Sequence, residues 1–190
     1  HKSYLRAGQD KRKAAHEKYR SENLSEIDEM TGIYNRRGFY RAAEAFIESS
    51  KGKDIIVCYA DMDNLKLVND GYGHSEGDFS IKSLALCLKE AFGENGIVGR
   101  MGGDEFAAFI LSEKTEGIES IIGKKRRYIE HLNRTANKPY HIDMSMGFCE
   151  CVCENSYDFK EAVDKADGKL YDNKTERKRR NKNKVSETDH

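Results

Sequence analysis

The chain has 190 residues, of which 35% are charged and 37% hydrophobic, and its 33 basic residues balance its 33 acidic ones. This length suits one domain with a buried core and an additional arm. Zero net charge argues against a general nucleic-acid-binding protein, which usually has a strong basic excess, so we expect no nucleic-acid partner. No apolar stretch approaches the length of a membrane span.

Five cysteines without paired spacing argue against a disulfide framework and favour a reducing compartment, so we expect a cytoplasmic domain. The sequence starts with His1 rather than Met and shows no signal peptide. We therefore expect a fragment of a longer protein that carries an upstream sensor domain or a membrane anchor.

Residues 2–26 predict a polar helical arm, because they are rich in Lys, Arg, Glu and Ala. Their few apolar positions bury little, so the arm could be half of a coiled coil with a partner chain. We assign residues 1–26 to this arm, 27–182 to one globular domain and 183–190 to a tail. Residues 174–184 are strongly basic and predict a solvated helix end that frays, with one or two lysines contacting phosphate.

Helices and strands alternate through the domain. Asn35 can cap a helix over residues 36–49, and the apolar residues 55–60 predict a buried strand. The remaining predicted elements are a helix over 75–92, a hairpin of strands 97–101 and 106–111, a helix over 116–133, a strand over 140–152 and a helix over 159–173. This order predicts an α/β (α+β) fold with a mixed central sheet wrapped by helices.

Three cysteines alternate on the predicted strand 140–152 and just after it: Cys149, Cys151 and Cys153. Alternation places them on one face, where three thiols could hold zinc. No nearby Cys or His pair completes a familiar zinc spacing, so we interpret them as small apolar packing residues.

Acidic residues lie at two strand ends. Asp61 and Asp63 end a buried strand, although Asp is a poor strand residue, and Asp104 and Glu105 follow two glycines at the hairpin tip. They could cap a helix and form a turn. If the two strands are neighbours, the clustered carboxylates would instead hold a divalent cation, since Mg²⁺ prefers oxygen ligands.

The turn-rich segment 69–74 predicts a loop before the helix over 75–92. Asn69 and Asp78 flank the end of this loop. An amide can donate and accept, and a carboxylate can accept from the N1–H and N2–H₂ groups of guanine. Asp78 could equally serve as a residue of the helix start.

Five ordered segments form recognisable motifs. Residues 28–37, 61–78, 100–106, 145–147 and 166–174 read DEMTGIYNRR, DMDNLKLVNDGYGHSEGD, RMGGDEF, SMG and ADGKLYDNK. In this order they resemble DxLTGLxNRR, DxDxFKxxNDxxGHxxGD, RxGGDEF, SxG and ADxALYxAK of the GGDEF family of diguanylate cyclases. Several long motifs in the family's order are a specific signal.

The resemblance implies a fold like the palm of nucleotide polymerases and nucleotidyl cyclases. It implies a diguanylate cyclase, a nucleotidyltransferase that condenses two GTP molecules into cyclic di-GMP and pyrophosphate. Each domain would hold one GTP, and each 3′-hydroxyl would attack the α-phosphate of the other GTP. A homodimer would then be needed for catalysis, with two Mg²⁺ or Mn²⁺ ions per active site.

The resemblance also implies roles for individual positions. Asp104 and Glu105 would be catalytic, and with Asp61 and the backbone carbonyl of Met62 they would hold the metal ions. Asn69 and Asp78 would read guanine. The other positions matched to the nucleotide site are Asn64, Leu65, Lys66, His74, Gly102, Gly103, Lys174 and Lys178.

The chain departs from the family pattern at three places. Leu65 stands where Phe is usual, and Lys178 stands where Arg is usual, which keeps the charge but loses bidentate geometry. Many members carry an inhibitory product site, RxxD, whose charged positions are Gly93 and Gly96 here. We therefore expect feedback inhibition through that site to be absent.

Other functions remain to be weighed against an active cyclase. A catalytically silent domain could bind GTP and regulate a neighbouring domain, although no acidic motif residue is lost. A cyclase of mixed base specificity would be favoured by a change at Asp78, which is kept. A chance likeness of one hairpin does not account for the ordered set of motifs.

Overall fold

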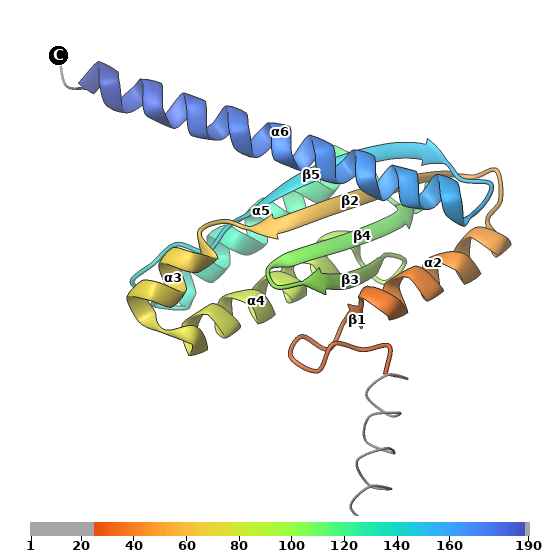
Figure 1. The fold of residues 1–190 in the computed structure, drawn as a ribbon, viewed down its shortest axis with the longest axis horizontal. Helices are drawn as coiled ribbons and strands as arrows, with labels where there is room; N and C mark the ends of the chain where they lie inside the picture. The colour runs from red at the N-terminus through yellow and green to blue at the C-terminus, as the bar shows by residue number, and fades with distance from the viewer. Residues whose placement is uncertain (1–24, 189–190) are drawn as a thin grey trace, which may run out of the picture.

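The computed structural model describes residues 25–188, and within this range the side chains except those of residues 177, 178 and 180–188 (Figure 1). The elements are β1 (Tyr34–Asn35), α2 (Arg36–Ser49), β2 (Asp54–Met62), α3 (Leu65–Tyr72), α4 (His74–Phe92), β3 (Ile97–Gly102), β4 (Glu105–Leu111), a 3₁₀ turn (Ser112–Lys114), α5 (Ile118–Thr135), β5 (Met144–Val152) and α6 (Ser156–Thr188). Most of the predicted helical arm lies outside the described residues. Within them, no helix is both long enough and apolar enough to cross a membrane.

The five strands form one mixed sheet in the order β1-β3-β4-β2-β5. β2 is antiparallel to both neighbours, β4 and β5, while β1 runs parallel to β3. Helices cover both faces, with α2 and α6 on one and α4 and α5 on the other (Figure 1). The predicted mixed sheet wrapped by helices is confirmed.

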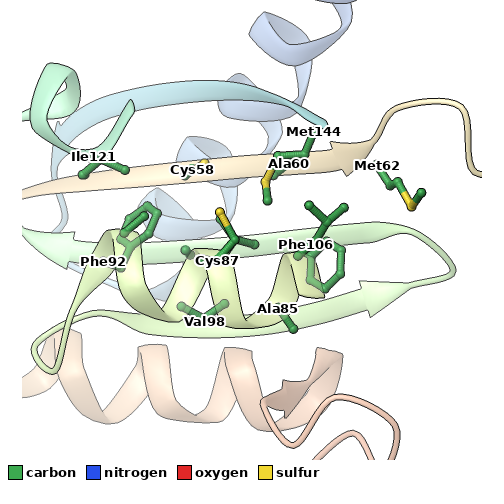
Figure 2. Close-up of a cluster of buried hydrophobic side chains, with 14 of the residues drawn as sticks. Cys58, Ala60, Met62, Ala85, Cys87, Phe92, Val98, Phe106, Ile121 and Met144 are labelled. Carbon is green, nitrogen blue, oxygen red and sulfur yellow. The ribbon is translucent and has the colours of Figure 1, made fainter. Parts of the chain in front are cut away.

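Two buried clusters lie on the two faces of the sheet, and β2 contributes alternate residues to each, as the two-residue period of a strand requires. Ile56, Cys58, Ala60 and Met62 face α4 and α5, whereas Ile55 and Val57 face α2 and α6. Figure 2 shows part of the first cluster, in which Cys58 of β2 and Cys87 of α4 lie in one layer. Strand β2 is therefore buried on both faces.

Helix α6 lies unusually close to β5. A Cβ atom at Gly147 would be only 2.1 Å from the carbonyl oxygen of Ala166 and 2.3 Å from the amide nitrogen of Leu170. Real Cβ atoms do not approach backbone atoms so closely, so only glycine permits this contact. The contact fixes where α6 rests along the strand.

Local patterns predicted α2 to its observed bounds and the strands of the hairpin to within one residue of theirs. Helix α2 begins and ends as expected, and the Asn35 side chain accepts a hydrogen bond from the Gly38 amide at 2.9 Å. The hairpin of β3 and β4 also forms as expected. Cys149 and Cys153 are buried in the second cluster with Cys151 packed against it, which agrees with the packing interpretation.

Three expectations about local structure were wrong. Residues 69–72 belong to helix α3 rather than to a loop, because buried Val68 anchors this helix to the core. β5 begins at Met144 rather than at residue 140, since the Asn133 side chain satisfies both backbone groups of Ile142. The final helix does not stop at residue 173, because no glycine or proline ends it before Thr188.

Candidate functional site

The acidic residues of β2 and β4 meet at one end of the sheet. Strand register places Asp61 opposite Glu105, and the Met62 amide donates a hydrogen bond to the Asp104 carbonyl oxygen at 3.1 Å. The Met62 side chain is buried in the core, so only its backbone is available to a ligand here. Asp104 is half-buried and Glu105 is exposed. The two strands are neighbours, as the sequence argument assumed.

The surroundings of Asp61 raise the pKa of its carboxyl. Burial raises its pKa, and the nearby Asp104 and Asp63 carboxylates raise it further, while a hydrogen bond from Lys174 opposes them. The net direction is upward, so the ionised form is electrostatically disfavoured in the absence of a further cation. A bound cation would relieve this repulsion.

Lys174 supplies the positive charge that the structure shows at this point. Its ammonium group forms an ion pair with the Asp61 carboxylate, and both side chains are largely buried. The resemblance assigned Lys174 to the triphosphate, and this role stays a prediction; in the structure its ammonium group pairs with Asp61. Lys178 follows one turn later on α6, but its side chain lies outside the description.

The oxygen atoms at this end of the sheet suit a hard divalent cation whose coordination shell is completed by oxygen atoms of the substrate. Among the described residues, no three His, Cys, Asp or Glu side chains converge closely enough to hold a metal ion by themselves. Mg²⁺ is commonly held by one or two carboxylates together with phosphate oxygens and water, rather than by a full protein cage. Asp61 and Asp104, with the Met62 carbonyl, match that partial set.

The hairpin tip is held from behind by Arg100. Gly102 and Gly103 have φ values of 151° and 52°, which side chains rarely adopt. The Arg100 guanidinium donates to the Gly103 carbonyl oxygen from Nε at 2.9 Å and from Nη2 at 2.7 Å, and it pairs with Asp28 at 3.2 Å. Sequence reasoning assigned no role to Arg100 or Asp28, although both lie in the motifs.

The surroundings of Asp28 favour the ionised carboxylate that pairs with Arg100. Burial alone would raise its pKa, but hydrogen bonds from the Thr31 hydroxyl (2.6 Å) and amide (2.9 Å), together with Arg100, lower it overall. Ionised Asp28 is thus favoured in the folded chain. Its charge links the segment before β1 to the tip of the hairpin.

The predicted guanine-reading residues come together where α3 and α4 meet. A Cβ atom at Gly77 would lie 2.0 Å from Oδ1 of Asn69, so the Asn69 side chain rests directly on the backbone beside Asp78. Both Asn69 and Asp78 are half-buried. An amide and a carboxylate at one junction can recognise the edge of a purine.

The other predicted nucleotide residues lie on or next to the same two helices. Asn64 adopts a left-handed conformation (φ 63°) that starts α3 directly after the acidic end of β2. Leu65 is half-buried, Lys66 is exposed, and His74 is the exposed first residue of α4. These residues therefore belong to the start of α3, directly after the acidic end of β2, and to the start of α4.

Residues around Asp63 support the acidic end. The Ser145 hydroxyl donates to Asp63 at 2.8 Å, and the Asp63 amide donates to the Asp143 carbonyl oxygen at 2.9 Å. The Asp143 carboxylate is in turn paired with Lys125 of α5 at 2.5 Å. Asp143 and Lys125 were missed by sequence reasoning, because neither lies in a recognised motif.

Gly93 and Gly96 lie away from this site. They line a depression of about 750 Å³ between α4, β3 and the segment before β1, where Ile27, Leu86 and Ile97 are also exposed to it. No Arg–Asp pair occupies the two glycine positions. The expectation that product inhibition is absent stays a prediction.

Residues 25–180 match the family model described as "Diguanylate cyclase, GGDEF domain". The chain is 31% identical over 179 residues to the probable diguanylate cyclase DgcC of Escherichia coli (strain K12), covering 92% of this chain and 47% of DgcC. It is 28% identical over 134 residues to the cyclic di-GMP phosphodiesterase PdeB of Shewanella oneidensis, covering 68% of this chain and 15% of PdeB. The chain thus spans half or less of these relatives.

A solved structure shares the fold. The crystal structure of the diguanylate cyclase SiaD, in complex with its activator SiaC from Pseudomonas aeruginosa, superposes with a TM-score of 0.68 at 25% identity. The match covers 93% of this chain and 71% of the SiaD chain. The sheet and helices that carry the acidic residues are therefore an arrangement known from experiment.

Proposed function

The chain belongs to the GGDEF family of diguanylate cyclase domains, and from this premise we propose that it condenses two GTP molecules into cyclic di-GMP and pyrophosphate. The observation that carries the proposal is the acidic end of the sheet, where Asp61 lies opposite Glu105 and beside Asp104. Repelling carboxylates at strand ends suit phosphoryl chemistry, in which positioning and charge neutralisation supply most of the catalysis.

Asp61, Asp104, Glu105 and the Met62 carbonyl would hold two Mg²⁺ or Mn²⁺ ions. When bound, such ions neutralise triphosphate charge and make a hydroxyl a better nucleophile. The remaining work belongs to the chain's own residues. Asp104 follows Gly103, whose carbonyl oxygen accepts two hydrogen bonds from Arg100, and its carboxylate would accept the proton of the attacking 3′-hydroxyl.

The substrate would be held from two directions. Asn69 and Asp78 would bind the guanine edge, while the exposed Lys66 and the backbone at Asn64 and Leu65 would contact the terminal phosphates. His74 would line the site, and the glycines at the hairpin tip would let the nucleotide approach the backbone. Lys174 and Lys178 would contribute positive charge from α6, with Lys174 exchanging Asp61 for a phosphate oxygen.

Two copies of the domain would face each other, so that each GTP supplies the 3′-hydroxyl for the other. Among the described residues, Asp61, Asp104 and Glu105 form one set of acidic residues at the sheet end, which is what a half-site requires. In the full-length protein, an upstream sensor or membrane domain would control how the two halves meet.

A second candidate is a silent GGDEF domain that binds GTP and regulates a neighbouring domain. It is favoured by one finding, the match to 15% of PdeB, a protein named for the opposite activity. The retained acidic residues favour the cyclase instead.

The test is product formation from GTP and Mg²⁺ over a range of enzyme concentrations, beside an Asp104→Ala variant. A cyclase of two half-sites gives cyclic di-GMP that rises faster than linearly with enzyme and disappears in the variant. If GTP binds but no product forms at any concentration, the silent GTP-binding domain replaces the proposal.

A further inference from the structure

A group of side chains outside the family motifs ties the α3–α4 junction to the loop before β5. Glu76, in the first turn of α4, accepts a hydrogen bond from the Tyr140 hydroxyl at 2.5 Å and forms an ion pair with Lys138 at 2.7 Å. Lys138 and Tyr140 both belong to the loop between α5 and β5. One carboxylate thus receives two donors from a single loop.

Aromatic rings make a second set of contacts between the two helices and the same loop. Tyr72, the last residue of α3, packs its ring on Tyr140 with a centroid distance of 4.9 Å and donates to the Pro139 carbonyl oxygen at 3.3 Å. The Lys138 ammonium also lies 4.4 Å from the centre of the Phe79 ring of α4. Both helices of the junction are therefore fastened to the loop.

These ties are partly shielded from water. The Glu76 and Lys138 side chains keep only 29% and 25% of their exposure, so their pairing is less screened than that of a surface ion pair. The hydrogen bonds from Lys138 and Tyr140 lower the pKa of Glu76, so its carboxylate is charged at neutral pH. We call Glu76, Lys138, Tyr140 and Tyr72 the brace.

The brace sits between the two ends of the candidate site. Glu76 is next to Gly77, on which the Asn69 side chain rests, and two residues from Asp78. The loop continues to Asp143, whose carbonyl oxygen accepts the Asp63 amide at the acidic end. A continuous set of contacts thus runs from the purine-reading junction to the carboxylates.

We propose that Glu76 and Tyr140 are positioning residues that set base recognition, by holding Asn69 and Asp78 at the correct distance from the acidic end. This inference rests on the proposed function, because it deepens how GTP is selected. Neither residue touches the reacting atoms. Their loss lets the helix junction shift, so binding of the base suffers more than the chemical step.

The experiment compares Glu76→Ala, Glu76→Gln and Tyr140→Phe with the parent chain, using GTP and inosine triphosphate. The amide of Glu76→Gln can still accept from Tyr140, and Tyr140→Phe keeps the ring contact while removing one donor. A matched control is Glu113→Gln, which removes an exposed ion pair with Lys53 (3.1 Å) at the end of strands β2 and β4 that lies away from the acidic residues. Inosine lacks the 2-amino group that a carboxylate such as Asp78 can read.

We expect Glu76→Ala to raise the KM for GTP about three- to tenfold while kcat changes less than about twofold. Glu76→Gln and Tyr140→Phe should show smaller increases in KM. The preference for GTP over inosine triphosphate should fall most in Glu76→Ala and less in the other two variants. A purely structural role would lower the melting temperature without changing that preference. Parent-like KM values and preference in all three variants would overturn the inference.

Failure of the proposed function gives a different result. If the parent chain binds GTP but forms no product, the cyclase is rejected, and titration calorimetry of GTP and inosine triphosphate with the same variants replaces the kinetic comparison. Weaker and less selective binding in the variants would then still support the brace, while unchanged binding would reject it. If Glu76→Ala does not fold, Glu76→Gln and Tyr140→Phe carry the comparison.

Discussion

The two ends of the candidate site are built by different means. At the acidic end, the register of β2 and β4 puts Asp61, Asp104 and Glu105 together, and the Asp104 carboxylate repels that of Asp61. At the helix junction, side-chain ties from the loop before β5 hold Asn69 and Asp78 in place. Backbone register is hard to alter by one substitution, whereas side-chain ties can be removed singly. Chemistry and base recognition should therefore be separable by mutation.

The largest effect is expected at the acidic end. Asp61→Asn should reduce cyclic di-GMP formation by at least about a hundredfold, because a carboxylate that would hold the metal ion is lost where charge develops. Product formation at saturating GTP and Mg²⁺ measures this. Asp54→Asn, at the exposed opposite end of the same strand, is the control and should behave as the parent does. Equal activity in both variants would remove Asp61 from the chemistry.

The next largest effect is expected on stability, where α6 packs against β5. Gly147→Ala places a Cβ against the backbone of α6, and we expect the free energy of unfolding to fall by about 1–3 kcal/mol as the helix is displaced. Gly168→Ala, on α6 but with no atom near its Cβ, should be neutral or slightly stabilising. Urea denaturation of both variants tests this. Equal stability would show that α6 rests on β5 less closely than described.

The helix junction should respond in substrate binding rather than in rate. Gly77→Ala would force the Asn69 side chain away, and we expect the KM for GTP to rise about tenfold with a much smaller change in kcat. Gly71→Ala, on α3 with no atom near its Cβ, provides the control and should leave KM unchanged. Steady-state kinetics decides the matter. A fall in kcat alone would contradict the division between the two ends.

The smallest effect concerns the support of the hairpin at low pH. The pKa of Asp28 is lower in the folded chain than its ordinary value, so its stabilising effect is present above that value and is lost as pH falls through the folded pKa. We expect Asp28→Asn to cost about 1 kcal/mol of unfolding free energy at pH 6, and less in strong acid. Denaturation between pH 6 and pH 3 measures the difference. A difference that does not narrow in acid would contradict the assignment.

The elements that could be predicted from the sequence are those determined by short-range patterns. Helix α2 and the hairpin follow from a cap, from periodicity and from turn glycines, all of which are short-range signals. Helix α3 was not predicted in this way, because burial of Val68 in the core outweighs the turn-forming residues of segment 69–74. Tertiary packing often overrides such local preferences.

The same division applies to the site. Motifs supplied the candidate residues, and the neighbouring strands brought Asp61 and Glu105 together as expected. The Lys174–Asp61 pair joins residues 113 positions apart, and the Tyr140–Glu76 bond joins residues 64 apart. No single-sequence pattern encodes such distances, so these contacts required the fold.

The close contact at Gly147 also sets the rotational phase of α6. Each residue advances a helix by about 100°, so a helix pinned at one point presents a defined side chain at every later position. Leu170 is pinned against Gly147, and Lys174 follows about one turn later, on the side that meets Asp61. Inserting one alanine between Leu170 and Lys174 would turn the ammonium group away from the carboxylate without changing any residue of the site. The close contact at Gly147 of β5 thus fixes the direction in which the Lys174 side chain leaves α6.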